Sequence, residues 1–393
     1  MRIKVNKNYA LLGESYLFSE IGKRERAYRA ANPDERVIKL GIGDVTLPLA
    51  PCVIDAMHRA TEEMAHIETF RGYAPEYGYD FTREAVARHY ADFGVTLDPD
   101  TVFISDGAKS DVGNITDIFG DNRILIPDPV YPVYVDSNLM AGRTPELLPG
   151  NEENGFLPMP DGVSGEGYVI YLCSPNNPTG AVYSREKLRE WVDFANRTGS
   201  VIIFDSAYEA FICGDYPHSI YEIDGARECA IEICSLSKTA GFTGTRCGWT
   251  IVPEELKADG LSLRSMWMRR QATKFNGVPY VIQRAAEAAL SPEGIAECME
   301  NIAYYRANAK TIADVLTSKN IKFTGGVSSP YIWMKCPNGM GSWEFFDYLL
   351  TKAQIVGTPG EGFGRSGEGY FRLTAFGNAE ATREAAERLR ALL

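Results

Sequence analysis

Six short, mostly apolar runs recur between residues 101 and 252 of the 393-residue chain. They are rich in Val, Ile, Tyr and Phe and carry few polar positions, which is typical of strands buried on both faces of a sheet. Gly and Pro residues gather where the runs end, as expected of turns between strands and helices. The predicted strands are residues 101–105, 123–127, 168–172, 201–205, 231–235 and 248–252.

Amphipathic helices are predicted between these strands. The clearest follows Ser184, a favourable N-cap residue, and ends at Gly199. Leu188, Trp191 and Val192 recur within it at the spacing of one helix face. Because strands alternate with helices, the pattern predicts an α/β protein with a mostly parallel sheet.

The pattern changes after about residue 283. Long helices are predicted at residues 285–290 and 302–317, followed by a strand at 331–335, a Gly-rich loop, a further strand and a terminal helix. We interpret this part as a second, smaller α+β domain that the N-terminal segment completes. The predicted division is a large domain at residues 49–282 and a small domain formed by residues 1–48 and 283–393.

Composition and charge exclude several classes of function. The chain has 40 Lys and Arg against 52 Asp and Glu, a net charge of −12, which disfavours nucleic acid as a partner. The eight Cys form no C-x-x-C pair and the four His are not closely spaced, so no metal site is predicted. There is no apolar N-terminal segment and no run long enough to cross a membrane, so we expect a cytoplasmic protein with reduced thiols.

Polar residues follow four of the predicted strands, where open α/β sheets bind their ligands. Each segment alone fits a turn, a helix cap or solvated surface. Together they supply a lysine for an imine bond, an acid for a pyridinium nitrogen, donors for a phenolic oxygen and a cradle for a phosphate. Pyridoxal phosphate requires this set of groups. The four segments are residues 106–110, 173–180, 205–208 and 235–239, and Arg246 follows the last of them.

The same segments resemble the signature of the fold-type I, class I and II pyridoxal-phosphate aminotransferases. The resemblance rests on an Asn-Pro-Thr-Gly turn at 177–180, Asp-x-x-Tyr at 205–208 and Ser-x-x-Lys at 235–238, in the family's order along the whole chain. It implies the aspartate aminotransferase fold, in which helices flank a mostly parallel sheet and a smaller α+β domain is attached. Residues 69–73, 237–246, 274–277 and 367–373 most closely resemble a branch whose substrates carry an amino acid group at each end.

The resemblance also implies the roles of the catalytic residues. Lys238 holds the cofactor and moves a proton between the substrate Cα and the cofactor. Asp205 keeps the ring nitrogen protonated, and Tyr208 and Asn177 bond to the phenolic oxygen. Tyr131 stacks on the ring, although a tyrosine of the core is an equally reasonable interpretation of its sequence context.

By the same resemblance, a set of small groups and one arginine bind the cofactor phosphate. They are the backbone amides of Ala108 and Lys109, the hydroxyls of Ser235 and Ser237, and the guanidinium of Arg246. Tyr73 matches a family residue that reaches the phosphate of the neighbouring subunit, which implies a homodimer with shared active sites. Asn276 matches a second position at the shared site, but an Asn-Gly turn explains it equally well.

Substrate binding is assigned to residues on both sides of the expected cofactor site. Arg372 matches the arginine that binds the substrate α-carboxylate, and its alternative is an edge-strand arginine that reaches solvent. The full set of predicted substrate residues is Tyr16, Gly43, Lys109, Tyr131, Asn177, Asn276 and Arg372. The partners expected are small amino acid and 2-oxo acid substrates.

Other interpretations stay open at this point. An aspartate- or alanine-type aminotransferase shares every cofactor residue, and a decarboxylase or lyase uses the same scaffold. A cofactor-binding regulatory module is disfavoured because no basic helix-turn-helix segment is present. Residues 362–367 fit G-x-G-x-x-G but precede a strand, so we reject a dinucleotide site. Ala74 and Tyr77 depart from the family pattern beside Tyr73.

Overall fold

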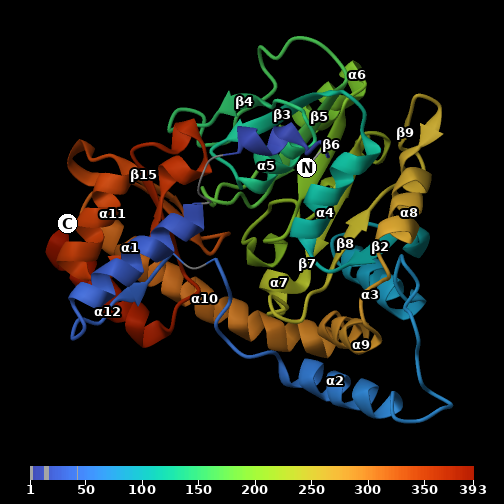
Figure 1. Cartoon of the computed structure of the whole chain (residues 1–393), viewed down its shortest axis with the longest axis horizontal. Helices are drawn as coiled ribbons and strands as arrows, with labels where there is room; N and C mark the ends of the chain where they lie inside the picture. The colour runs from blue at the N-terminus through green and yellow to red at the C-terminus, as the bar shows by residue number, and fades with distance from the viewer. Residues whose placement is uncertain (1–2, 13–16, 42) are drawn as a thin grey trace.

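A seven-stranded sheet forms the centre of the computed structural model, which describes residues 3–12, 17–41 and 43–393 (Figure 1). Its order is β2-β8-β7-β6-β5-β3-β4, and β8 runs antiparallel to the other six strands, which all point the same way. All six predicted strands are present, and the mostly parallel sheet is confirmed. The strands are β2 (Val102–Ser105), β3 (Arg123–Asp128), β4 (Glu146–Pro149), β5 (Tyr168–Cys173), β6 (Val201–Asp205), β7 (Ala230–Ser235) and β8 (Gly248–Ile251).

Both faces of this sheet are buried. Neighbouring residues of one strand contribute to different cores: Phe103 and Ile203 belong to one cluster, and Ile104 and Ile202 belong to the other. This follows from the alternation of side chains along a strand. The helices of this part are α2 (Pro51–Glu63), α3 (Asp80–Ala91), α4 (Ala108–Asn114), α5 (Val133–Met140), α6 (Arg185–Thr198), α7 (Leu236–Thr239), α8 (Leu263–Lys274) and α9 (Tyr280–Ala289).

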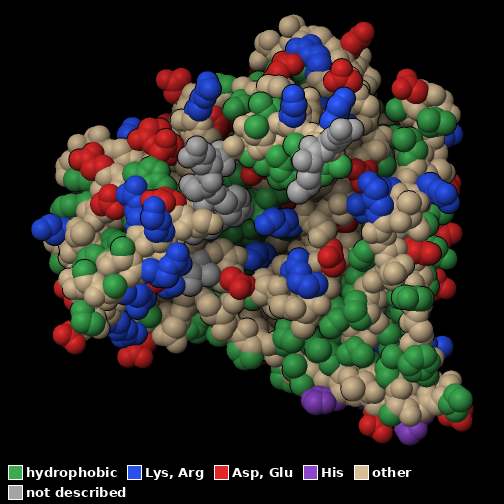
Figure 2. Space-filling model, viewed as in Figure 1, with side chains coloured by type: hydrophobic (Ala, Val, Ile, Leu, Met, Phe, Trp, Pro, Cys, Tyr) green, Lys and Arg blue, Asp and Glu red, His purple; other side chains and the backbone are tan. Residues whose placement is uncertain are grey.

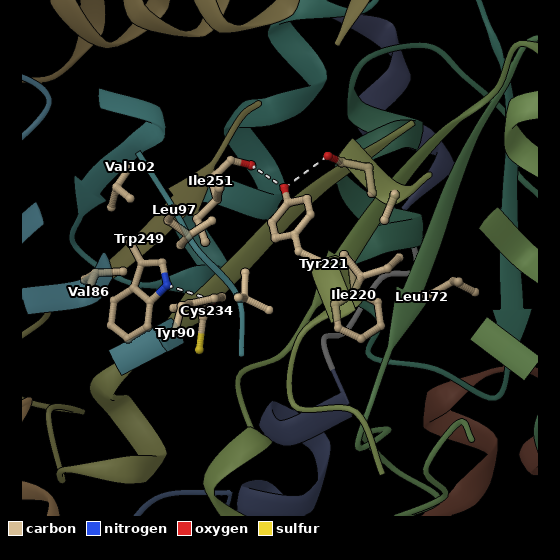
Figure 3. Close-up of a cluster of buried hydrophobic side chains, with 14 of the residues drawn as sticks. Val86, Tyr90, Leu97, Val102, Leu172, Ile220, Tyr221, Cys234, Trp249 and Ile251 are labelled. Carbon is tan, nitrogen blue, oxygen red and sulfur yellow. Dashed lines mark hydrogen bonds between the residues drawn. The ribbon is translucent and has the colours of Figure 1, made fainter. Parts of the chain in front are cut away.

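The larger core also contains tyrosine and tryptophan side chains whose polar ends are satisfied. Trp249 Nε1 donates to Tyr90 Oη over 3.1 Å, and Tyr221 Oη bonds to the Ile251 carbonyl over 3.1 Å (Figure 3). Burying these rings without such partners would cost free energy. These bonds fix α3 and the segment around Tyr221 against the sheet.

Helix α6 shows how closely local sequence sets an element. The Ser184 side chain accepts a hydrogen bond from the Lys187 amide, and Gly199 ends the helix with φ 61°. Leu188 and Trp191 are fully buried. The predicted boundaries and buried face are therefore confirmed.

A second sheet of four antiparallel strands forms the other part of the molecule, in the order β11-β12-β15-β14. The N-terminal segment joins this part because β1 pairs parallel with β13. The strands are β1 (Ile38–Lys39), β11 (Phe323–Gly325), β12 (Tyr331–Lys335), β13 (Ile355–Val356), β14 (Thr358–Pro359) and β15 (Tyr370–Thr374); β9 (Lys257–Ala258) and β10 (Leu261–Ser262) form a separate hairpin. The helices are α1 (Leu17–Ala31), α10 (Pro292–Ser318), α11 (Ser342–Ala353) and α12 (Ala379–Leu392).

Helix α10 passes from one part to the other (Figure 1). Its Cys298 packs in the core of the large sheet, whereas Ile312 and Leu316 pack in the core of the second part. The helix begins ten residues earlier than predicted because Ser291 caps it and Pro292 occupies the first turn. Within the described residues, no helix is long and apolar enough to span a membrane.

Candidate active site

The polar segments that follow β2, β3, β5, β6 and β7 meet at one edge of the large sheet. They enclose a cavity of about 160 Å³. Figure 2 shows a hollow between the two parts of the molecule in which Lys and Arg side chains gather. Every predicted cofactor residue except Tyr73 lines the cavity, whose lining is Ala108, Lys109, Tyr131, Tyr134, Cys173, Asn177, Asp205, Ala207, Tyr208, Ser235, Ser237, Lys238, Thr243 and Arg246.

Lys238 lies in the short helix α7, and its amino group points into the cavity. Its Nζ donates to the Gly43 carbonyl and lies 5.2 Å from the centre of the Phe376 ring. Burial lowers the pKa of Lys238 to about 8, and the nearby cations Arg372 and Arg246 act in the same direction. About one-tenth of this amine is therefore uncharged at pH 7, far more than for an ordinary lysine, and the uncharged form is the one that acts as a nucleophile or proton acceptor.

Asp205 ends β6 and is almost completely buried. Tyr134 Oη donates to its Oδ2 over 2.6 Å, and the Ala207 amide donates to its Oδ1 over 3.0 Å. Burial raises the pKa of Asp205, and the hydrogen bond from Tyr134 opposes that change. Sequence analysis missed Tyr134, whose only local signal is its position one helical turn after Tyr131.

Tyr208 bonds to a second tyrosine from the other part of the molecule. The hydroxyls of Tyr208 and Tyr331 are 2.6 Å apart, and both side chains are buried. Tyr331 belongs to β12, 123 residues further along the chain. Sequence analysis missed Tyr331 because nothing near it in the chain indicates this contact.

Arg372 lies on β15, which is an interior strand between β12 and β14, and it is 1% exposed. The alternative of an edge-strand arginine that reaches solvent is therefore wrong. Its Nη1 donates to Asn177 Oδ1 over 2.7 Å, and its Nη2 donates to the Gly41 carbonyl over 3.2 Å. The first bond joins the small sheet to the Asn-Pro-Thr-Gly turn of the large part, and the second joins it to the N-terminal segment.

Two aromatic rings flank the Arg372 guanidinium. Its Cζ lies 4.5 Å from the centre of the Tyr331 ring and 4.7 Å from that of Phe363. Phe363 belongs to the glycine run at 362–367, which forms two 3-10 turns, η8 (Gly360–Phe363) and η9 (Arg365–Gly367), before β15. The run precedes β15, as its place in the sequence indicates, and does not link a strand to a helix.

The residues predicted to bind the phosphate lie where the backbone of Gly107 comes close to the side chain of Arg246. Gly107 has φ 123°, and a Cβ there would lie 2.3 Å from Arg246 Nη2. Arg246 Nη1 donates to Ser237 Oγ over 3.4 Å. A Cβ on Gly248 would lie 2.8 Å from the Gly107 Cα. The two glycines, which sequence analysis did not single out, therefore let Arg246 close against the start of α4.

Two predicted residues, Tyr73 and Asn276, lie elsewhere. Tyr73 is 89% exposed and does not line the cavity. Asn276 is also exposed, and its neighbour Gly277 packs against Ala74, so these two segments meet at one surface. Tyr16 lies outside the described residues.

Gly43, in contrast, lies at the site. A Cβ on Gly43 would be 3.6 Å from the Tyr331 hydroxyl and 3.8 Å from Arg372 Nη2. Its carbonyl also accepts the hydrogen bond from Lys238. The structure thus brings the predicted lysine and the predicted carboxylate-binding arginine to the same backbone segment.

Comparisons with known proteins agree with this geometry. The family model "Aminotransferase class I and II" matches residues 35–389. The LL-diaminopimelate aminotransferase of Lachnospira eligens is 55% identical over 99% of this chain and 100% of its own length. That of Azobacteroides pseudotrichonymphae is 53% identical over 100% of this chain and 99% of its own.

Solved structures give the same result. The L,L-diaminopimelate aminotransferase of Chlamydomonas reinhardtii is 41% identical, with a TM-score of 0.94 over 100% of this chain and 99% of that chain. An aspartate aminotransferase mutant of Thermus thermophilus, 21% identical, has a TM-score of 0.88 over the full length of both chains and supports the fold alone. The predicted aspartate aminotransferase fold is confirmed, and the chain belongs to the class I and II aminotransferase family.

Proposed function

We propose that this protein transfers an amino group from LL-2,6-diaminopimelate to 2-oxoglutarate, giving tetrahydrodipicolinate, glutamate and water. The observation that carries the proposal is the position of Lys238. Its buried amine lies in one cavity with an acid, Asp205, and an anion-binding arginine, Arg246, and next to a second arginine, Arg372. The relatives named for this activity match the whole chain.

The residues present fit pyridoxal phosphate as the cofactor. Gly107 and Gly248 leave room for Arg246 and Ser237 to surround a phosphate at the start of α4. Asp205 lies at the carboxyl end of β6 and lines the same cavity, where a carboxylate stabilises a protonated ring nitrogen. When bound, pyridoxal phosphate joins an amine covalently and withdraws electrons from the adjacent carbon, which makes the proton on that carbon acidic.

The chain's own residues orient the substrate and move that proton. Arg372, held between two rings and bonded to Asn177, presents a planar guanidinium to a carboxylate. Lys238 Nζ, with its lowered pKa, would accept a proton from the substrate Cα and return it to the cofactor carbon C4′. Tyr208, whose hydroxyl is held by that of Tyr331, would donate to the phenolic oxygen of the cofactor.

The proposed substrate carries an amino acid group at its distal end, which needs a second charged contact. Lys109 lines the cavity and is positioned to bind the distal carboxylate. We expect Lys109→Ala to raise KM for LL-diaminopimelate about tenfold or more and to change that for aspartate little, because an ionic hydrogen bond contributes about 1.5–3 kcal/mol. Equal effects on both donors would contradict this assignment.

We also propose that the protein is a homodimer with shared active sites. Tyr73 and Asn276 lie on neighbouring surface segments away from their own chain's cavity. Ile67 and Phe70, 90% and 58% exposed, precede Tyr73 in the same segment. A second copy that covers this surface would bury those side chains and bring Tyr73 to the partner's phosphate site.

A steady-state assay tests the proposed reaction. Purified protein with pyridoxal phosphate and 2-oxoglutarate is supplied with LL-diaminopimelate, meso-diaminopimelate, aspartate or alanine, and glutamate is measured. We expect LL-diaminopimelate to be the preferred donor, with parallel lines in double-reciprocal plots because both half-reactions use one site. A preference for aspartate or alanine would leave the fold and cofactor site intact and would overturn the proposed substrate.

We propose a cytoplasmic location. All eight cysteines are free thiols, six of them buried, as in proteins of a reducing compartment.

A further inference from the structure

A cluster of three ionisable side chains, two of them buried, lies beside Tyr208 and outside the cavity. Glu209 follows Tyr208 directly and begins the turn η4 (Glu209–Phe211). His218 Nδ1 lies 3.0 Å from Glu209 Oε2, and His89 Nε2 lies 3.3 Å from Glu209 Oε1. His89 comes from α3 and His218 from the loop after η4, so the two imidazoles bind one carboxylate from two separate segments.

The carboxylate at the centre of this unit is charged. Burial alone would raise the pKa of Glu209, but the hydrogen bonds from His218 and His89 outweigh it and lower the pKa to about 2. Burial disfavours a charged His89, yet the contact with Glu209 still raises its pKa. The carboxylate of Glu209 is therefore ionised and paired inside the protein, where an unpaired charge would be costly.

This unit is connected to Tyr208 through a rigid turn. The Phe211 amide donates to the Tyr208 carbonyl over 3.0 Å, and the Glu209 amide donates to the Ser206 carbonyl over 2.9 Å. Arg306 of α10 donates to the Ala210 carbonyl over 3.2 Å. Glu209 belongs to the turn that directly follows Tyr208, so contacts that hold Glu209 also hold the backbone next to Tyr208.

A second buried acid holds the other end of the same segment. Ser206 Oγ and Tyr90 Oη both donate to Glu232 Oε1, over 2.9 and 2.7 Å. Tyr90, labelled in Figure 3, follows His89 in α3, so that helix contributes consecutive side chains to both anchors. The other titratable groups that face the unit are Glu232, Cys234, Asp92 and Glu222, whose Oε1 accepts from the His218 amide over 2.6 Å.

We propose that Glu209, bound by His89 and His218, is a positioning residue that aims the Tyr208 hydroxyl at the phenolic oxygen of the cofactor. The proposal rests on the proposed cofactor site. A hydroxyl that donates to this oxygen stabilises its ionised form and lowers the pH at which the lysine-bound cofactor loses its proton. Glu209 controls that midpoint through Tyr208 and without touching the cofactor.

The sign of the midpoint change separates positioning from a direct effect of charge. In Glu209→Gln, a misplaced Tyr208 raises the midpoint of the visible-absorbance titration, by about one pH unit. If Glu209 acted only as a nearby anion, its removal would favour loss of the proton and lower the midpoint.

The experiment is this titration on protein loaded with pyridoxal phosphate, for the wild type, Glu209→Gln, His218→Gln, Tyr208→Phe and the double variant Glu209→Gln with Tyr208→Phe. We expect a raised midpoint in all four variants and no further rise in the double variant. His218→Gln, at a partly exposed position, provides the test if Glu209→Gln does not fold. The control is Glu254→Gln, which weakens the ion pair with Arg264 and no contact of Glu209, His89 or His218, and it should keep the wild-type midpoint.

An unchanged or lowered midpoint in both Glu209→Gln and His218→Gln would overturn the proposal. It would also be overturned if Glu209→Gln raised the midpoint as much in the Tyr208→Phe background as in the wild type. A wild-type protein that shows no visible band would instead overturn the proposed cofactor. The two failures are therefore distinguishable.

Discussion

At the scale of single residues, the site depends on burial that changes the acid–base properties of a few groups. Lys238 and Asp205 both reach the cavity from strand ends, and burial favours the neutral form of each. Tyr134 opposes this at Asp205 by a short hydrogen bond. The chemistry needs a neutral amine and an ionised acid, so burial favours the required form of Lys238 and opposes that of Asp205, which the hydrogen bond from Tyr134 favours.

Burial of the charged Lys238 amine is expected to lower the free energy of unfolding, which can be tested. Its folded pKa of about 8 lies below the ordinary value of 10.5, so the unfolded chain binds the proton more tightly between these two values and stability rises with pH there. Below pH 8 the buried charge costs the native state on the order of 3 kcal/mol. We expect cofactor-free Lys238→Met to be more stable than the wild type at pH 7, in urea unfolding, with a difference that shrinks towards pH 10.5. A difference that does not vary with pH would contradict the lowered pKa.

Tyr134 offers a second prediction at this scale. Tyr134→Phe removes the 2.6 Å hydrogen bond to Asp205 and leaves the carboxylate with the Ala207 amide. Since a hydrogen bond to a charged group contributes about 1.5–3 kcal/mol, we expect cofactor affinity to fall about tenfold or more in an equilibrium titration. Tyr171→Phe is the matched control, because Tyr171 stacks on Tyr134 but does not bond to Asp205. Equal losses in both variants would indicate a packing effect.

At the scale of elements, local patterns predicted those structures whose signals are continuous in the chain. The six central strands and α6 were predicted because buried runs and caps are local features. Strand β4 was missed because it is short and largely exposed, and β1, β13 and β14 have only two residues each. The contact between Tyr208 and Tyr331 joins two elements far apart in the chain, so no local pattern reveals it.

The start of α4 carries a prediction about backbone geometry. Gly107→Ala places a side chain at φ 123° and against Arg246, which we expect to cost about 1–3 kcal/mol of stability and to weaken cofactor binding. Gly113→Ala is the control in the same helix, where no atom lies within 4 Å of the added Cβ. It should stabilise the protein by about 0.5–1 kcal/mol in the same thermal or urea unfolding experiment. Loss of cofactor affinity in the Gly113 variant would count against a specific role for Gly107.

At the scale of the whole molecule, the two sheets complete one site, and Arg372 and Tyr331 of the small sheet contact Asn177 and Tyr208 of the large part. The resemblance to a family pointed to Arg372, Asn177 and Tyr208 but not to Tyr331, and only the fold shows which side chains meet within one chain. Tyr73 lies apart from the cavity, so its predicted role requires a second subunit.

Subunit mixing tests the shared site. Lys238→Ala and Tyr73→Phe are each expected to lower activity, and hybrid dimers of the two should regain it, because one of their two sites then has an intact lysine and an intact tyrosine. Size measurement of each variant checks that dimers form. Activity that never exceeds the sum of the separate variants, although dimers exchange, would show that Tyr73 does not serve the partner's site.

The central claim is that Lys238 and its surroundings form a cofactor site selective for LL-diaminopimelate. It is tested most directly by the visible absorbance of the protein loaded with pyridoxal phosphate, before and after addition of LL-diaminopimelate without a 2-oxo acid. We expect a visible band that Lys238→Ala alters. LL-diaminopimelate should remove this band, whereas aspartate, alanine and the meso isomer should change it little. Absence of the band, or its loss only with aspartate or alanine, would contradict the account.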